Sequence, residues 1–179
     1  QDVGGLVGRS SGALNLYSSN YSGTTVSSSA YDVGGLIGYS SNTLDIRNAF
    51  VNMQAGSLGV RGSYAIAGLV GYCAATVSIQ SDNTNLASYG SSVVPYSNAT
   101  INATSTGAPN ATYITTAASY AGGLIGAVGP GSVNLTNTRF TGASVTGTSA
   151  GGYVGGLVGY SYSGGTLSNS NSSASISGG

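Results

Sequence analysis

A six-residue segment that recurs five times, short apolar pulses between the copies, and a high glycine content together predict an all-β fold. The expected architecture is a parallel β-solenoid (β-helix) of about five to six coils, roughly 30–33 residues per coil, with one enlarged coil. Regular repetition indicates stacked supersecondary units, each of which buries its apolar face against its neighbours. We therefore expect residues 1–179 to form a single repeat domain.

The repeated segment reads VGGLVG at residues 3–8 and again at 154–159, with three variants between them. The leucines in these five copies are spaced 30, 33, 55 and 33 residues apart, and a β-branched residue follows each of them. Stacked coils would place like residues on one another in two ladders. The predicted ladder core comprises Leu6, Leu36, Leu69, Leu124, Leu157, Val7, Ile37, Val70, Ile125 and Val158.

Each repeat contains two further short apolar segments, here called pulses, and their patterns favour strands over helices. A second pulse with alternating apolar residues begins eight to ten residues after each leucine, as in LNL at Leu14 and LDI at Leu44, and weakens to LSN at Leu167. A third, looser pulse includes Val26 and the ASV that starts at Ala143. Alternation of this kind is typical of strands. The 31 glycines argue against helices, because each glycine inside a helix costs about 1 kcal/mol relative to alanine.

Two expectations concern the outside of the repeated segment. In a single strand the leucine and the next residue point to opposite faces, so both faces would be apolar and a packed loop or a neighbouring molecule would cover the outer one. Three residues after the leucines lie Arg9, Tyr39, Tyr72, Ala127 and Tyr160. Stacking of adjacent coils would make Tyr39 and Tyr72 a candidate aromatic stack, serving either as structural packing or as a carbohydrate platform.

The VGGLVGYS-type segment, followed by a TL-containing strand, resembles the GLUG motif. That repeat is found in large secreted and surface proteins, including bacterial adhesin-like proteins and relatives of immunoglobulin-A peptidases. The resemblance covers most of the chain in five copies, with a gap near residues 80–115. It implies a secreted or surface β-solenoid, and the motif supplies no catalytic residues. The copy at Ala67-Gly68 and the residue Ala127 depart from the usual pattern.

The spacing of 55 residues between Leu69 and Leu124 marks an insert or irregular coil at about residues 82–115. It is either a protruding loop that packs along the solenoid or an extra coil without the glycine-rich segment. Three Asn-Ala-Thr triplets lie here, and three other triplets also fit the N-glycosylation pattern. Unmodified turn asparagines are the alternative explanation. The glycosylation candidates are Asn20, Asn98, Asn102, Asn110, Asn134 and Asn171, of which Asn134 should face solvent.

The charge inventory excludes several classes of function. The chain has four arginines and four aspartates but no Lys, Glu or His, so it forms no basic patch for nucleic acid and no P-loop. A nucleophilic triad also lacks its base, and the dispersed aspartates do not suit a polysaccharide lyase or hydrolase. We expect no enzyme activity, cofactor or metal site, although Asp2 and Asp32 occupy equivalent positions. The single Cys73 is expected to be a small buried hydrophobe, with an intermolecular disulfide as the alternative.

These observations suggest an extracellular or cell-surface structural protein, a solenoid subunit or segment of a self-assembling fibre or stalk, glycosylated at its sequons. The expected partners are further copies, added head to tail through the terminal coils or laterally on the apolar strand, together with covalent glycans. The chain starts within one copy of the repeat and stops where another is due. No nucleic acid and no membrane insertion are expected. An adhesin or carbohydrate-binding module is the main alternative, and an ice-binding solenoid, suggested by Thr24-Thr25 and Thr115-Thr116, is a minor one.

Overall fold

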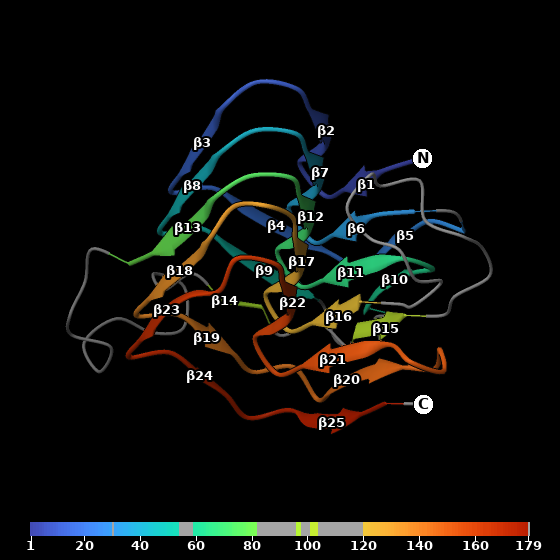
Figure 1. Cartoon of the computed structure of the whole chain (residues 1–179). Coiled ribbons are helices and arrows are strands. Elements are labelled where there is room, and N and C mark those ends of the chain that lie inside the picture. Colours follow the sequence, from blue (N-terminus) through green and yellow to red (C-terminus); the bar gives the residue numbers. More distant parts are fainter. Residues whose placement is uncertain (30, 54–58, 82–95, 98–100, 104–119, 179) are drawn as a thin grey trace.

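The computed structural model describes residues 1–29, 31–53, 59–81, 96–97, 101–103 and 120–178. Within these residues the chain passes through five parallel sheets of five strands each, and no helix occurs. We number the sheets 1 to 5 in the order in which each coil passes them. The strands of each sheet descend in chain order from the N-terminal to the C-terminal end of the stack (Figure 1).

The five sheets contain one strand from every coil. Sheet 1 contains β1 (Val3–Gly4), β6 (Val33–Gly34), β11 (Ala65–Ala67), β16 (Tyr120–Gly122) and β21 (Tyr153–Gly155). Sheet 2 contains β2 (Val7–Ser10), β7 (Ile37–Ser40), β12 (Val70–Cys73), β17 (Ile125–Val128) and β22 (Val158–Ser161). Sheet 3 contains β3 (Leu14–Tyr17), β8 (Leu44–Arg47), β13 (Val77–Gln80), β18 (Val133–Thr136) and β23 (Gly165–Ser168). Sheet 4 contains β4 (Asn20–Gly23), β9 (Phe50–Met53), β14 (Tyr96–Ser97), β19 (Arg139–Phe140) and β24 (Asn171–Ser172). Sheet 5 contains β5 (Thr25–Ser27), β10 (Gly59–Gly62), β15 (Ile101–Ala103), β20 (Ser144–Gly147) and β25 (Ser175–Ser177).

The predicted all-β parallel solenoid is confirmed. Coils 1 to 5 begin at β1, β6, β11, β16 and β21, and four full turns separate the first strand of a sheet from the last. The expected five to six coils is therefore slightly high. Each coil also holds five strands where the sequence indicated three pulses. The reason is that the repeated hexapeptide is divided between sheets 1 and 2, and that the third pulse covers two further sheets. The AFV segment at residues 49–51 places Val51 in sheet 4, whereas Val26 and Val145 lie in sheet 5.

The repeated hexapeptide is a corner and not one strand. In coil 2 it ends sheet 1 at Gly34 and begins sheet 2 at Ile37. The backbone N–H groups of Leu36 and Ile37 both donate to the carbonyl of Leu69 in the next coil, at 3.0 Å each. Both side chains therefore turn into the core, where each is fully buried. The expectation of a doubly apolar strand is wrong for this reason, and lateral packing on such a strand loses its premise.

Glycines allow the two strands of the corner to approach each other closely. A Cβ atom on Gly34 would overlap the carbonyl oxygen of Ile37, and one on Gly38 would lie 2.6 Å from the backbone nitrogen of Val3 in the preceding coil. Neither contact is compatible with a side chain. As a result the outer faces of sheets 1 and 2 pack against each other, and the residues beyond the corner form a second apolar cluster outside the main core.

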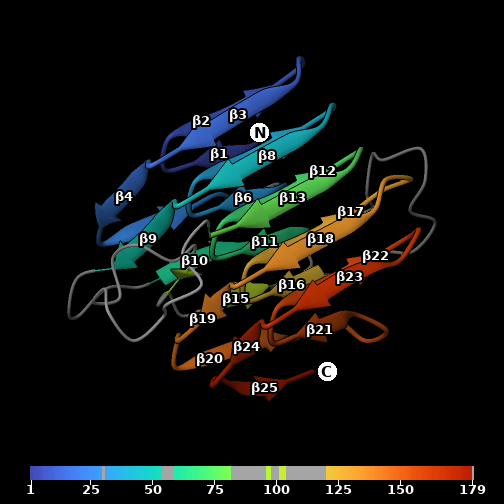
Figure 2. The ribbon, with the colours of Figure 1, turned by 90° about the vertical axis from the view of Figure 1, so that its left-hand side faces the viewer.

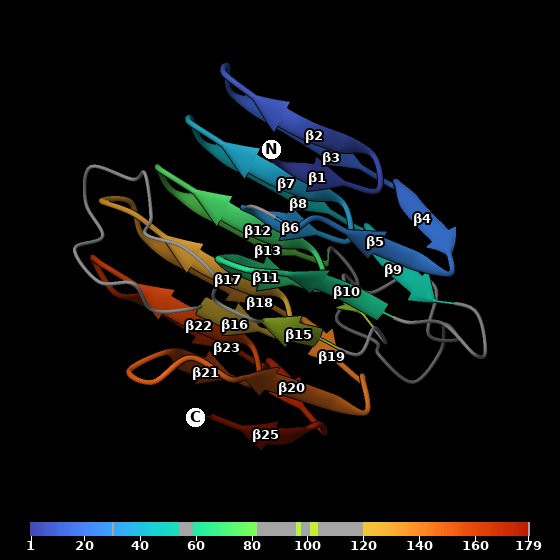
Figure 3. The same cartoon turned by 90° about the vertical axis from the view of Figure 1, so that its right-hand side faces the viewer.

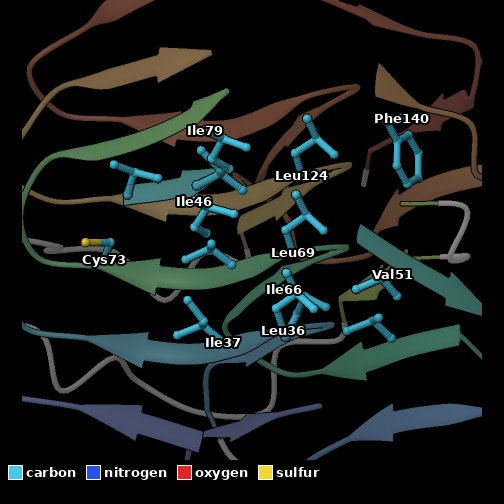
Figure 4. Close-up of a cluster of buried hydrophobic side chains, with 14 of the residues drawn as sticks. Leu36, Ile37, Ile46, Val51, Ile66, Leu69, Cys73, Ile79, Leu124 and Phe140 are labelled. Carbon is cyan, nitrogen blue, oxygen red and sulfur yellow. The ribbon is translucent and has the colours of Figure 1, made fainter. Parts of the chain in front are cut away.

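The main core runs the length of the stack as columns of like residues. Leu36, Leu69 and Leu124 lie one above another, with Ile46 and Ile79 facing them from sheet 3 (Figure 4). Alternating burial along β8, β13 and β18 places every second residue inside, as the second pulse predicts. Each of these three strands thus buries half of its side chains while its backbone bonds to the coils on both sides.

A polar ladder forms the turn between sheets 3 and 4. Ser18, Asn48, Asn137 and Asn169 occupy this turn with φ between 49° and 52°. Asparagine tolerates this left-handed conformation better than most residues. The turns are joined along the stack, because the side-chain amide of Asn169 donates to Oδ1 of Asn137 at 2.8 Å and that of Asn137 donates to the carbonyl of Ser81 at 3.3 Å.

The enlarged coil is coil 3, and its described residues complete the normal circuit. β14 pairs with β9 and β19, so residues 96–97 take the regular place in sheet 4 (Figure 1). β15 pairs with β10 and β20, so residues 101–103 take the regular place in sheet 5 (Figure 3). They form no additional coil. The remainder of residues 82–115 lies outside the described residues.

Replacing Gly34 by alanine should destabilise the whole solenoid, because the new Cβ meets backbone atoms that are themselves bonded to two coils. We expect the free energy of unfolding to fall by about 3 kcal/mol, the upper range for overpacking. Thermal and urea unfolding followed by circular dichroism measure the change.

The matched control is Gly12→Ala, because no atom lies within 4 Å of a Cβ at that position. This change should stay within about 0.5 kcal/mol of the wild type. Equal effects of the two substitutions would contradict the proposed role of the close approach at the corner.

Candidate functional site

Paired columns of side chains line the outer angle between sheets 1 and 2. One column belongs to sheet 2, and the other stands just before or at the start of sheet 1, where Ala65, Tyr120 and Tyr153 are in register. The two members of each pair are seven positions apart in the sequence. The pairs are Asp2 with Arg9, Asp32 with Tyr39, Ala65 with Tyr72, Tyr120 with Ala127, and Tyr153 with Tyr160.

The pairs are complementary in size and charge. Asp2 and Arg9 form an ion pair at 3.2 Å, and the rings of Tyr153 and Tyr160 have their centroids 5.2 Å apart. In coils 3 and 4 a small residue faces a large one, but the order is reversed between the two coils. The sequence predicted the sheet 2 column, but of the facing column only the equivalence of Asp2 and Asp32. That the two columns face each other was not predicted, although the constant spacing of seven positions across the corner indicates it.

The predicted stack of Tyr39 on Tyr72 is present, with ring centroids 5.5 Å apart and planes 10° apart. The guanidinium of Arg9 continues the stack, 4.3 Å from the Tyr39 centroid. Tyr72 is only 2% exposed, so its ring offers no face to a sugar. The arrangement therefore fits structural packing and not the carbohydrate platform. Such ring pairs contribute about 0.5–1.5 kcal/mol beyond area burial.

Tyr120 occupies the space that Ala127 leaves in the sheet 2 column. Its ring lies parallel to that of Tyr153 at 5.7 Å, and its centroid is 5.2 Å from that of Tyr160. Tyr64 meets it edge-on at 5.4 Å. The departure of Ala127 from the tyrosine pattern is therefore compensated by a ring that comes from the facing sheet.

Asp32 is the buried acid of this region. Burial, followed by the nearby carboxylate of Asp2, raises the pKa of Asp32 well above its ordinary value, while a bond from the backbone N–H of Ala65 opposes the shift. Within the described residues its Oδ1 atom and the buried hydroxyl of Tyr64 have no hydrogen-bond partner. Asp2 is already paired with Arg9, so the two aspartates do not form a joint ion site.

The predicted ladder residues occupy the corner of every coil. Leu36, Leu69 and Leu124 are fully buried, and the residues that follow them are equally buried. In the end coils, Val7, Leu157 and Val158 are partly buried against the core, whereas Leu6 is 43% exposed. The repeated segment thus leaves its ladder open at both ends of the described stack.

The glycosylation candidates differ in accessibility. Asn20 and Asn171 are exposed in sheet 4, and Asn134 is partly exposed on β18 between buried Val133 and Leu135. Asn102 pairs in β15 with Arg61 and Thr146. Asn98 and Asn110 lie outside the described residues.

Cys73 is buried in the main core, as predicted, and its thiol donates to the carbonyl of Asn42 at 3.3 Å. Burial raises its pKa to about 11, which keeps the unreactive thiol form at neutral pH. Thr25 stands opposite Gly59, so among the described residues it has no threonine above it in the next coil. Thr115-Thr116 lie outside the described residues. In the described part, no three acidic, histidine or cysteine residues gather as a metal site, and no helix could cross a membrane.

The stacked parallel coils and their like-on-like columns define a β-solenoid repeat protein. Residues 150–177, which contain all five strands of coil 5, match the family model of the GLUG motif. This match and the fold confirm that the repeat is of the GLUG type, and coils 1 to 4 place their own copies in the same register. Comparisons with curated proteins and with solved structures found no match.

Exchanging the large and small partners in coil 4 tests the facing columns. Tyr120→Ala alone should cost about 3–5 kcal/mol by leaving a cavity, and Ala127→Tyr alone should destabilise by overpacking against Tyr120. The double variant reproduces the Ala65–Tyr72 arrangement of coil 3 and should recover at least half of the summed loss. A double-mutant cycle from urea unfolding gives the coupling, and simple additivity would refute direct contact.

Asp32→Asn should make folding more stable at neutral pH. Because the pKa of Asp32 is higher in the folded than in the unfolded state, protonation of this acid favours folding. This contribution to stability is complete below the unfolded-state pKa of about 4 and is lost as the pH rises through the folded-state pKa. The variant should therefore exceed the wild type in unfolding free energy at pH 7 and match it near pH 3. Urea unfolding over this range provides the measurement. A variant that is less stable than the wild type at pH 7 would show that the charged form of Asp32 is favourable.

Proposed function

We propose that this chain is an extracellular structural protein, a β-solenoid subunit or segment of a self-assembling fibre or surface stalk, with no catalytic role. The observation that carries the proposal is the openness of both end coils. Leu6 at one end and Leu167, 54% exposed, at the other belong to columns that are fully buried in coils 2 to 4. The first and last strands of all five sheets also leave one backbone edge without a partner in the described structure.

The two open ends match each other in register. If coil 1 of a second copy stacked on coil 5 with the spacing used inside the chain, Leu157 would meet Leu6 and Leu167 would meet Leu16. On the outside, Tyr160 would meet Arg9, whose guanidinium already lies over Tyr39. Arginine would then be held between two tyrosine rings, which favours a cation–π contact on each face. A second copy that stacks in this register would complete each open end.

The surface supports an extracellular and glycosylated form of this fibre. The chain has only eight formally charged residues, so hydration of the outside depends on neutral polar groups. Exposed sequon asparagines at Asn20 and Asn171, with Asn134 on the outer face of sheet 3, are accessible positions for sugars. Covalent glycans there would add the hydration that charges do not supply.

Assembly should be visible directly when the purified chain is concentrated and imaged by negative-stain electron microscopy. We expect filaments whose mass per length corresponds to end-to-end coils, and growth in mean length with concentration. Leu6→Lys should abolish them, because a charge would be buried in the junction. The variant should keep the wild-type melting temperature of the monomer, since Leu6 is already half exposed.

The matched control is Thr141→Lys, which adds the same charge to an exposed position in coil 4, away from either end. It should leave filaments intact. Wild-type chains that stay monodisperse monomers at millimolar concentration would refute the fibre, and filaments that persist in Leu6→Lys would refute the head-to-tail junction.

A further inference from the structure

The outer face of sheet 3 carries polar side chains on every coil. Outward positions of adjacent strands are in register, so one column reads Asn15, Asp45, Ser78, Asn134 and Thr166. The strands of this sheet are presented side by side in Figure 2. Across coils 1 to 3 the face is hollowed by a cavity of about 430 Å³. Its polar lining includes Asn15, Thr43, Asp45, Thr76, Ser78 and Gln80.

Charged and aromatic groups in this hollow are held in place by one another. Arg47 donates from Nε to both carboxylate oxygens of Asp45, at 3.2 and 3.0 Å. Tyr17 donates its hydroxyl to Oδ2 of the same carboxylate at 3.1 Å, and Arg47 lies 5.5 Å from the Tyr17 ring centroid. With its amide in the favourable orientation, Gln80 accepts from Arg47 at 3.0 Å. Side chains from three coils are therefore positioned before any ligand arrives.

Other groups in the hollow keep their hydrogen-bonding capacity. The side-chain amide of Asn15 and the hydroxyl of Ser78 make no hydrogen bond to another group of the described chain. Asp45 retains acceptor capacity, because a carboxylate offers about four lone-pair positions. Tyr17, 52% exposed, borders the hollow with an accessible ring. The surface thus combines free donors and acceptors with one aromatic face.

This chemistry selects the class of ligand. The single cation is neutralised by Asp45, so a polyanion such as a nucleic acid gains little here. The lining offers mostly amide, hydroxyl and carboxylate groups, so an apolar ligand is also disfavoured. A polyhydroxylated molecule can use the donors and acceptors together and place a C–H face on Tyr17. We propose that this hollow is a binding site for an uncharged oligosaccharide lying across coils 1 to 3.

The site is independent of the fibre proposed above, because all of its residues lie within one chain. Binding is therefore tested on the full chain carrying Leu6→Lys, in which end-to-end assembly is blocked, and on the wild type. The probes are an array of neutral plant and microbial oligosaccharides, followed by titration calorimetry with the best of them. We expect affinity in the micromolar to low millimolar range, insensitive to salt between roughly 50 and 500 mM.

Asp45→Ala should weaken binding at least about tenfold, because it removes a charged acceptor and releases Arg47 and Tyr17. Thr166→Ala is the matched control, since this exposed residue stands in the same column but two coils beyond the hollow. It should change affinity less than twofold. Thermal melting of both variants verifies that they fold.

Three outcomes would overturn the proposal. The first is that no neutral oligosaccharide binds even when its concentration is raised to about 10 mM. The second is binding that Asp45→Ala leaves unchanged, which would place the sugar elsewhere. The third is binding of anionic polysaccharides only, abolished by salt, which would indicate an electrostatic contact. None of these results depends on whether filaments form.

Discussion

At each Gly-Gly-Leu corner two successive backbone N–H groups share a single carbonyl of the next coil, and the rest of the structure depends on this arrangement. In coil 2 the N–H groups of Leu36 and Ile37 share the carbonyl of Leu69, and the same pattern recurs between the other coils. A carbonyl oxygen has two lone pairs, so the sharp turn leaves no donor unpaired. Both side chains enter the core as a consequence. Because every corner bonds to the one above and below it, the geometry has to repeat, and so does the segment that allows it.

Folding the outer faces of sheets 1 and 2 together creates a second packing problem, which the chain solves pair by pair. In coils 3 and 4 one tyrosine and one alanine form the pair in opposite order, as Ala65 with Tyr72 in one coil and Tyr120 with Ala127 in the next. The same seam carries the ion pair of Asp2 and Arg9 at the N-terminal end. The seam therefore tolerates sequence variation that the corner itself does not, because side chains adjust to one another whereas a Cβ beside a backbone atom cannot move away.

Ladder bonds and stacked apolar columns hold the coils together, and charges contribute little. The ion pairs in the described part of the chain join Asp2 to Arg9 and Asp45 to Arg47, and both lie on outer faces. Exposed ion pairs contribute about 0–1 kcal/mol. Since the same interactions act between any two coils, an end coil presents the surface that an interior coil buries. A further coil added to either end would therefore make the contacts that interior coils make.

The sequence by itself determined the repeat, the parallel stacking and the columns of like residues, because periodic identity in a glycine-rich chain has few other physical explanations. Leu36, Leu69 and Leu124 were found from spacing alone, as were the strands that begin at Leu44 and Val77. The pairing of Tyr39 with Tyr72 also followed from register.

Only the tertiary structure decided that the hexapeptide bends. The alternation of side chains between two faces holds only for one straight strand, and the carbonyl that accepts from both N–H groups of the corner belongs to a residue 33 positions away, as Leu69 does for Leu36. The same bend decided that Tyr72 is buried, and that sheets 1 and 2 face each other. Likewise, Tyr17, Asp45, Arg47 and Gln80 gather on one face only when three coils are stacked. Local pattern thus specifies which residues repeat, whereas the direction in which the chain turns between them follows from backbone contacts between coils.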